Sequence, residues 1–303
     1  MVCITGVEMR ELKGTEVARS VFEDVRRRCR EFVDKTAVSV HLAVVLVGSD
    51  GASQSYVASK GKACDEMGFV HTDIRLPDST SEAELISVVE KLNSDSSVHG
   101  ILVQIPLPKH ISEHRIAETI APDKDVDGLN PVNLGKLLLG QSCLVPCTPA
   151  GILEILSYYH IETKGTHAVV IGRSAIVGKP MASLLMNKQC DATVTVCHSK
   201  TKNLAQMTAR ADILVVAMGK PLCVTRDMVK PGAVVIDVGI NRIPDSTKKR
   251  GYRIVGDVDY SAVADMCSAI TPVPGGVGPM TIAMLMKNTL QACMTQYGEH
   301  NCR

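Results

Sequence analysis

The chain has 303 residues, of which 45% are hydrophobic and 21% charged, so it has room for about two domains with buried cores. Its formal net charge of +1 argues against a role dominated by nucleic acid or by a membrane surface, and we expect neither as a partner. Eleven cysteines without a recurring Cys-x-x-Cys pattern, no recognisable targeting signal and no apolar run of membrane length predict a soluble protein with reduced thiols. We expect it in the cytoplasm, with a reducing organelle as the alternative.

The first half of the chain alternates between strand and helix patterns. Apolar residues recur at helical spacing over residues 15–35. After them we expect strands at 41–47, 69–76 and 100–105, helices at 53–67 and 82–93, a short further helix and a turn-rich loop at 122–128. The β-α-β-α-β order predicts parallel strands joined by right-handed crossovers.

The second half repeats this alternation after a proline-containing boundary at 146–149. We expect helices at 150–159, 179–185 and 280–295, strands at 168–171, 192–197, 213–218 and 233–238, and a ribbon-like pair about 252–255. The prediction is an α/β fold of two parallel-sheet domains with a cleft between them and long helices joining them. The first domain is expected at 1–148, completed by a C-terminal helix at about 280–303, and a Rossmann-type dinucleotide-binding domain at 149–279.

A glycine-containing turn at 168–178 organises the second domain, with the sequence Ala-Val-Val-Ile-Gly-Arg-Ser-Ala-Ile-Val-Gly. A strand that hands over to a helix in this way offers N–H groups and a positive dipole end to a phosphate. Gly172 permits the tight turn, and Gly178 permits close packing of the helix against the strand. The spacing is Gly-x-Ser-x-x-x-Gly and not the usual Gly-x-Gly-x-x-Gly, so a βα turn without a ligand stays an alternative for this stretch alone.

The strand after this turn lacks the acidic residue that would bind the ribose 2′-hydroxyl of NAD. In its place Arg173, Ser199, Lys200 and Thr201 offer positive charge and hydroxyl groups. A 2′-phosphate suits such a site, so we expect NADP as the cofactor.

Tyr56 and Lys60 lie four residues apart on a helix that follows a strand, so they share one face that can point beyond the sheet edge. A Tyr/Lys pair at this spacing is also a common surface contact. Three further features indicate a ligand site: Gln104 at a strand end, Asp127 in an Asp/Gly loop, and the Pro/Gly-rich stretch 272–279, which has no bulky side chains.

Two pairs of residues have the chemistry of metal ligands, His110 with His114 and Cys143 with Cys147. The histidines have no third ligand nearby, and the cysteines lack a second pair at zinc spacing. We therefore expect exposed polar residues and free thiols, and no metal site.

Five blocks follow one another along almost the whole chain: Ser-Tyr-Val-Ala-Ser-Lys at 55–60, Gly-Ile-Leu-Val-Gln-Ile-Pro-Leu-Pro at 100–108, Asp-Lys-Asp-Val-Asp-Gly at 123–128, Gly-Arg-Ser at 172–174 and Pro-Val-Pro-Gly-Gly-Val-Gly-Pro-Met-Thr at 272–281. Together they resemble the bifunctional methylenetetrahydrofolate dehydrogenase/cyclohydrolase family, with no departure at the catalytic positions. The resemblance implies NADP-dependent oxidation of 5,10-methylenetetrahydrofolate to the 5,10-methenyl cation, then hydrolysis to 10-formyltetrahydrofolate. It also implies a homodimer and a place in one-carbon metabolism and purine biosynthesis.

The resemblance assigns roles to four residues. Lys60 would handle the proton in hydrolysis, with Gln104 orienting it through a hydrogen bond. Asp127 would accept N–H bonds from the pterin, and Tyr56 would stack on the aminobenzoyl ring. Further substrate contacts are implied for Val103, Ile105, Pro272, Gly275 and Gly276, and cofactor contacts for Gly172, Arg173, Ser174, Gly178, Ser199 and Ile240.

Two alternatives belong to other classes. Short-chain dehydrogenases use a Tyr-x-x-x-Lys pair, but in that family the pair follows the cofactor turn, whereas Tyr56 precedes Gly172 here. A non-enzymatic dinucleotide-sensing module would need only the turn at 172–178, and would leave Gln104 and Asp127 unexplained.

Overall fold

The computed structural model describes residues 9–248 and 250–301, which fall into two units. Unit 1 contains the described residues up to Ala18 together with Thr148–Thr281, and unit 2 contains Arg19–Cys147 and the residues from Ile282 onward. The domain prediction assigned the first 18 residues to the other half. The described residues 9–18 lie in unit 1, where strand β1 (Arg10–Glu11) pairs in parallel with β11 (Ala269–Ile270).

Unit 2 is built on a three-stranded parallel sheet with the order β3-β2-β4. Its strands are β2 (His41–Val47), β3 (Val70–Leu76) and β4 (Gly100–Val103). Strand β2 lies in the centre of this sheet, with β3 as its neighbour on one side and β4 on the other. The strand order therefore reverses between β2 and β4. Open α/β sheets bind ligands outside the carboxyl ends of the strands at such a point.

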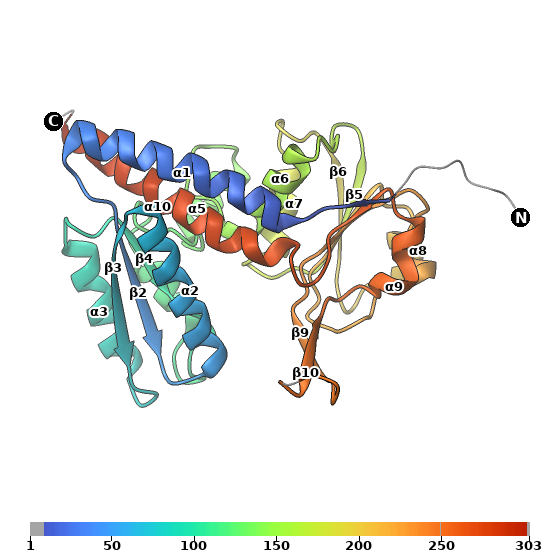
Figure 1. The fold of residues 1–303 in the computed structure, drawn as a ribbon, viewed down its shortest axis with the longest axis horizontal. Helices are drawn as coiled ribbons and strands as arrows, with labels where there is room; N and C mark the ends of the chain where they lie inside the picture. The colour runs from blue at the N-terminus through green and yellow to red at the C-terminus, as the bar shows by residue number, and fades with distance from the viewer. Residues whose placement is uncertain (1–8, 249, 302–303) are drawn as a thin grey trace, which may run out of the picture. The chain divides into compact units, whose positions relative to one another are not determined.

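The helices of unit 2 cover both faces of this sheet, with α2 and α3 on opposite sides (Figure 1). They are α2 (Gly51–Met67), α3 (Glu82–Ser94), α4 (Glu113–Thr119) and α5 (Pro131–Leu138), with parts of α1 (Gly14–Thr36) and α10 (Val277–Asn301). Alternate residues of β2, Ala43 and Val45, pack with Leu85 and Val89 of α3 in one core. The strand period of two therefore decides which face of β2 meets α3.

Unit 1 is built on a six-stranded parallel sheet with the order β1-β11-β8-β7-β5-β6. Its further strands are β5 (His167–Ile171), β6 (Thr193–Cys197), β7 (Ile213–Val216) and β8 (Val234–Asp237), and β9 (Asn241–Pro244) forms an antiparallel hairpin with β10 (Tyr252–Val255). Its helices are α6 (Cys147–Tyr158), α7 (Gly178–Met186), α8 (Leu204–Thr208) and α9 (Tyr260–Val263), with short 3-10 turns at Arg226–Met228 and Ala264–Met266. The strand order reverses between β5 and β7, which marks the expected ligand position of this sheet.

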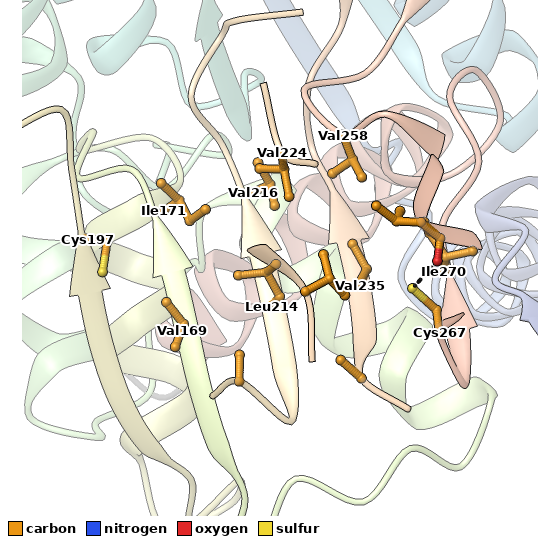
Figure 2. Packing of buried hydrophobic residues seen from close by; sticks show 14 residues of the cluster. Val169, Ile171, Cys197, Leu214, Val216, Val224, Val235, Val258, Cys267 and Ile270 are labelled. Atoms are coloured by element: carbon orange, nitrogen blue, oxygen red, sulfur yellow. Dashed lines mark hydrogen bonds between the residues drawn. The ribbon is translucent and has the colours of Figure 1, made fainter. Parts of the chain in front are cut away.

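One face of the unit 1 sheet carries a continuous apolar core (Figure 2). Val169 and Ile171 of β5, Leu214 and Val216 of β7, and Val235 of β8 are all fully buried in it. Their alternation along each strand places them on the same face, and the carboxyl ends of these strands are thereby held in register.

The predicted α/β class with parallel sheets is confirmed, and every expected helix and strand is present, most of them with ends shifted by a few residues. The strand expected at 100–105 ends at Val103, before Pro106, whose ring removes an N–H group. The last helix begins at Val277, so part of the expected 272–279 loop is its first turn, a position where Pro279 is tolerated. Strands β1 and β11 and helices α5, α8 and α9 were not predicted, although Asn130 followed by proline is a helix-start signal for α5.

Within the described ranges, none of the helices combines the length and the apolar character needed to cross a bilayer. The predicted cleft between the domains stays a prediction.

Candidate active site

The predicted Tyr/Lys pair lies on α2, the helix that follows β2. Asp50 fixes the start of this helix by accepting a hydrogen bond from the backbone N–H of Ser53 at 2.8 Å. Tyr56 is 45% exposed, whereas Lys60, one turn later, is only 7% exposed. One face of α2 therefore presents an accessible ring and a buried amine.

Gln104 receives this amine at the carboxyl edge of the sheet. Its backbone N–H donates to Val45 O at 2.8 Å, which fixes the residue next to β2 just after β4 ends. The Lys60 Nζ donates to Gln104 Oε1 at 2.7 Å, and both side chains are buried. The two candidates thus meet where the strand order reverses.

Burial and neighbouring charge act in opposite directions on Lys60. Desolvation lowers the pKa of its amine, and the nearby Asp127 carboxylate and Cys147 partly restore it. Burial raises the pKa of Asp127, while the charge of Lys60 and a hydrogen bond with the Cys147 thiol lower it. The pKa values of this amine and this carboxylate are thus shifted toward each other, as is common for groups that exchange protons in active sites.

Asp127 is partly exposed and lies in a loop that is fastened to β4. Asp125 forms a parallel bridge with Ile101, whose N–H donates to Lys124 O at 2.8 Å. Gly100 leaves room for this loop, because a Cβ there would lie 2.6 Å from the Val126 Cγ1 atom. The position of the Asp127 backbone is therefore set by the sheet.

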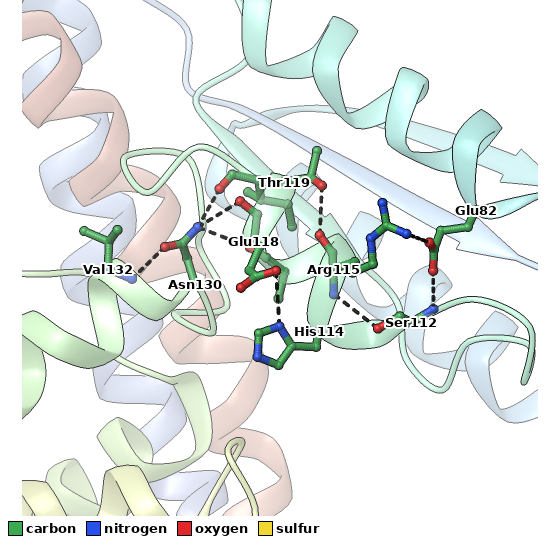
Figure 3. Close-up of polar contacts among 10 residues, drawn as sticks. Glu82, Ser112, His114, Arg115, Glu118, Thr119, Asn130 and Val132 are labelled. Carbon is green, nitrogen blue, oxygen red and sulfur yellow. Dashed lines mark hydrogen bonds and ion pairs between the residues drawn. The ribbon is translucent and has the colours of Figure 1, made fainter.

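The far end of the same loop is held by Asn130 (Figure 3). Its Nδ2 donates to Ile120 O at 2.9 Å, and its Oδ1 accepts from Val132 N at 2.8 Å, which caps α5. The backbone N–H of Asn130 donates to the buried Asp125 carboxylate at 2.7 Å. One asparagine thus joins the end of α4, the loop and the start of α5.

His110 and His114, which were considered as metal ligands, contact protein oxygen atoms. His114 Nδ1 lies 3.3 Å from Glu118 Oε2 (Figure 3), and His110 Nε2 lies 2.9 Å from Thr80 O. Cys143 and Cys147 are both free thiols. The described residues hold no group of three or more side chains arranged to bind a metal ion.

The remaining substrate candidates are divided between the units. Val103 is buried at the end of β4 and Ile105 is half-buried two residues later. Pro272, Gly275 and Gly276 belong to unit 1, where a Cβ on Gly276 would lie 2.5 Å from Pro272 O. Their contact with a folate stays a prediction.

The glycine turn of unit 1 leaves no space for larger residues. Gly172 has a φ of +131°, and a Cβ on it would lie 2.4 Å from Ala217 O. A Cβ on Gly178 would lie 2.2 Å from the backbone oxygen of Gly172, the residue that directly follows β5, so the start of α7 lies very close to the end of this strand. The backbone forms a close cradle that only glycine permits at these two positions.

Ser174 occupies part of the helix start that was expected to be free for a phosphate. Its Oγ accepts from Val177 N at 3.1 Å and from Gly178 N at 3.4 Å. Two N–H groups of the first turn are therefore already satisfied by this hydroxyl.

The other cofactor candidates lie at the same sheet edge. The N–H of Gly172 donates to Cys197 O at 2.9 Å, which places the turn beside the end of β6. Arg173 and Ser199, from these two neighbouring segments, are both exposed. Ile240 follows β8 and is 52% exposed. The structure thus brings the cofactor candidates to the carboxyl ends of β5, β6 and β8.

Two buried carboxylates at this edge were missed by sequence reasoning. Asp257 accepts from Met218 N at 2.6 Å and Gly219 N at 2.8 Å, and so holds the loop after β7. Asp237 accepts from Gly239 N at 2.9 Å and from Asp257 N at 3.0 Å. Burial raises the pKa of Asp237 to about 6 although these N–H bonds lower it. An acidic residue that ends an apolar strand was the available signal.

Both units match one family of enzymes. The catalytic domain of tetrahydrofolate dehydrogenase/cyclohydrolase matches residues 12–127, and the NAD(P)-binding domain of the same family matches residues 146–297. This chain belongs to the tetrahydrofolate dehydrogenase/cyclohydrolase family. Membership decides against a short-chain dehydrogenase and against a non-enzymatic dinucleotide module.

Relatives with known names or structures align with this chain along nearly their whole length. The bifunctional protein FolD of Chlorobium phaeobacteroides strain BS1 is 54% identical over 287 residues, 93% of this chain and 96% of the relative. The FolD crystal structure from Campylobacter jejuni is 46% identical with a TM-score of 0.90, covering 95% of this chain and 99% of that one. FolD from Trypanosoma brucei, solved with NADP and an inhibitor, is 37% identical with a TM-score of 0.91, covering 96% and 99%.

Proposed function

We propose that unit 2 carries the folate chemistry of this chain and that Lys60 is its central catalytic group. The chain is a bifunctional enzyme that oxidises 5,10-methylenetetrahydrofolate with NADP and hydrolyses the 5,10-methenyl product to 10-formyltetrahydrofolate. The observation that supports the residue assignment is the buried contact of 2.7 Å between Lys60 Nζ and Gln104 Oε1 at the point of strand reversal.

The oxidation needs positioning more than side-chain chemistry. Lone pairs on the two nitrogens that flank the one-carbon unit expel the hydride, so no protein base is required. NADP, when bound, supplies the acceptor for that hydride. The duty of Tyr56 and Asp127 is to hold the folate: the exposed ring stacks on the aminobenzoyl group, and the carboxylate accepts N–H bonds from the pterin.

The hydrolysis does need a proton acceptor. Water adds to the methenyl carbon and loses a proton. The bond from that carbon to the ring nitrogen then breaks as the nitrogen takes up a proton and the new hydroxyl gives up its own proton to become the formyl carbonyl, so that one proton is released overall. Lys60 suits the first transfer because burial lowers the pKa of its amine, and a bound cation would favour the neutral form further. Gln104 fixes the amine in place and Asp127 supplies the compensating charge when Lys60 is protonated.

Unit 1 binds the dinucleotide at the glycine cradle formed by Gly172 and Gly178. The positive charge of Arg173, with Ser199 at the neighbouring strand end, suits a 2′-phosphate. The assignment of Ser174 changes in one respect: its hydroxyl caps the helix start, so it supports the cradle before it contacts any ligand.

The family resemblance also supports a homodimer and a contribution to purine biosynthesis. Nine described cysteines are free thiols, which supports a reducing compartment. Light scattering on the purified chain would measure the assembly, and a monomeric mass would contradict the dimer.

One assay tests the function. Purified protein is mixed with 5,10-methylenetetrahydrofolate and NADP, and absorbance is followed for the reduced cofactor and for the methenyl intermediate. We expect reduced cofactor to form with little accumulation of the intermediate. If no reduced cofactor forms, the dehydrogenase assignment is wrong, and if methenyl accumulates without decay, the cyclohydrolase assignment is wrong.

A further inference from the structure

We propose that Asn288 of α10 is a positioning residue that holds the Asp127 carboxylate in the orientation in which it accepts N–H bonds from the pterin. Its Nδ2 donates to Val126 O at 2.9 Å, the carbonyl immediately before Asp127. The same Nδ2 donates to Val145 O at 2.8 Å. Asn288 is only 7% exposed, so these bonds do not compete with bulk water.

The two carbonyls belong to segments that meet around Asp127. Cys147 Sγ donates to the same Val126 carbonyl at 3.4 Å, and Asn288 Nδ2 lies 3.7 Å from that sulfur. On the other side of Asp127, Gly128 has a φ of +73°, and a Cβ there would lie 2.5 Å from Pro146 N. The backbone on both sides of Asp127 is therefore fixed against residues 145–147.

A second amide of α10 acts at the start of the same loop. Gln296 Nε2 donates to Asp123 O and to His99 O, each at 2.9 Å. Gln296 follows Asn288 by eight residues, close to two helical turns, so both amides extend from one side of α10. Each joins two backbone carbonyls, one of them in the loop 122–128.

The arrangement matters for binding because a carboxylate that accepts two N–H bonds must face its donors within about 10–20°. Removing the Asn288 amide would leave the carbonyls of Val126 and Val145 buried without this donor. The loop would then relax at the residue next to Asp127. Asn288 thus acts on the substrate through Asp127 and does not touch it.

This inference rests on the proposed role of Asp127, and Asn288→Leu tests it. We expect the KM for the folate substrate to rise roughly tenfold in both activities, while the KM for NADP stays unchanged. Asn288→Ser keeps one hydroxyl donor and should recover part of the loss; it also serves as the test variant if Asn288→Leu does not fold. Thr289→Val is the matched control, since it removes a buried hydrogen bond to Leu285 O from the same helix.

A double-mutant cycle with Asp127→Asn separates the two claims. If Asn288 acts through Asp127, its effect on the folate KM disappears in the Asp127→Asn background. Additive effects, or an unchanged folate KM in both Asn288 variants, would overturn the positioning role alone. If Asp127→Asn itself leaves the folate KM unchanged, the proposed function of that carboxylate fails instead.

Discussion

The two sheets of this chain have their candidate ligand sites in corresponding positions, but the side chains at the two sites differ in burial. Each has its candidate residues at the carboxyl edge, where the strand order reverses. In unit 2 the proposed catalytic group is the buried Lys60, whose pKa is lowered by desolvation. In unit 1 the named side chains, Arg173 and Ser199, are exposed, and the close packing is left to the glycines of the turn.

The difference follows from what each unit has to do. A lysine amine serves as a proton acceptor only when its high pKa is lowered, and burial lowers the pKa of Lys60. Recognition of a phosphate requires only backbone N–H groups and a permanent positive charge. We therefore expect substitutions in unit 2 to change turnover and folate binding, and substitutions in unit 1 to change cofactor binding.

The strongest test of this comparison is Lys60→Met. We expect the cyclohydrolase rate to fall about 1000-fold, since general acid–base groups contribute about 10²–10⁴-fold, with NADP binding nearly unchanged. Stopped-flow decay of the methenyl absorbance measures the rate. Lys62→Met on the same helix, whose side chain is 79% exposed, is the control and should be neutral. Unchanged turnover in the Lys60 variant would remove this amine from the mechanism.

Asp127→Asn should have the next largest effect. Replacing the carboxylate weakens charge-assisted acceptance of N–H bonds, and we expect the folate KM to rise roughly 50-fold in both activities. Asp123→Asn changes an exposed carboxylate of the same loop and is the matched control. A loss confined to NADP binding would contradict the pterin role.

Arg173→Ala tests whether unit 1 recognises the 2′-phosphate of NADP. We expect NADP affinity to fall roughly 20-fold, because an ionic hydrogen bond is lost, and NAD affinity to fall less than about twofold. Isothermal titration with both cofactors measures the ratio. Arg210→Ala, an exposed arginine that precedes β7 at the other end of the sheet, should change neither. Equal losses for both cofactors would show that no 2′-phosphate is bound there.

The smallest expected effect concerns Asp237. Its folded pKa of about 6 lies above its ordinary value of 3.8, so the folded state takes up a proton before the unfolded state does. This group therefore adds stability as pH falls from 7 to 5, by about 1 kcal/mol, and that gain is lost as pH rises through 6. Denaturant unfolding at several pH values should show the gain in the wild type and not in Asp237→Asn.

The control for that experiment is Asp265→Asn. Asp265 is exposed, and the ion pair with Arg226 lowers the pKa of its carboxyl, so its contribution changes only below its ordinary pKa. The slope between pH 7 and pH 5 should be that of the wild type. If Asp237→Asn keeps the full slope, another group causes it.

Much of the fold could be predicted from the sequence because strand and helix periods are local. Lys60 and Gln104 could also be placed, since residues after strand ends in a parallel sheet gather at one edge. Asn288 and Gln296 could not: polar residues in a helix pattern look like a solvated face until their partners, 162 and 197 residues away, are known. The short strand β1 has two residues and no periodicity to detect.

The division of the chain into units has a consequence for biosynthesis. Unit 1 has all its segments once residue 281 has been made, whereas unit 2 waits for residues 282 onward, although its strands are among the first segments synthesised. Asn288 and Gln296 are therefore made after every other segment that contacts the loop 122–128 through the bonds described above. A nascent chain that stops short of them would already contain every strand of the six-stranded sheet, while the loop of Asp127 still lacked the two side-chain amides that α10 contributes.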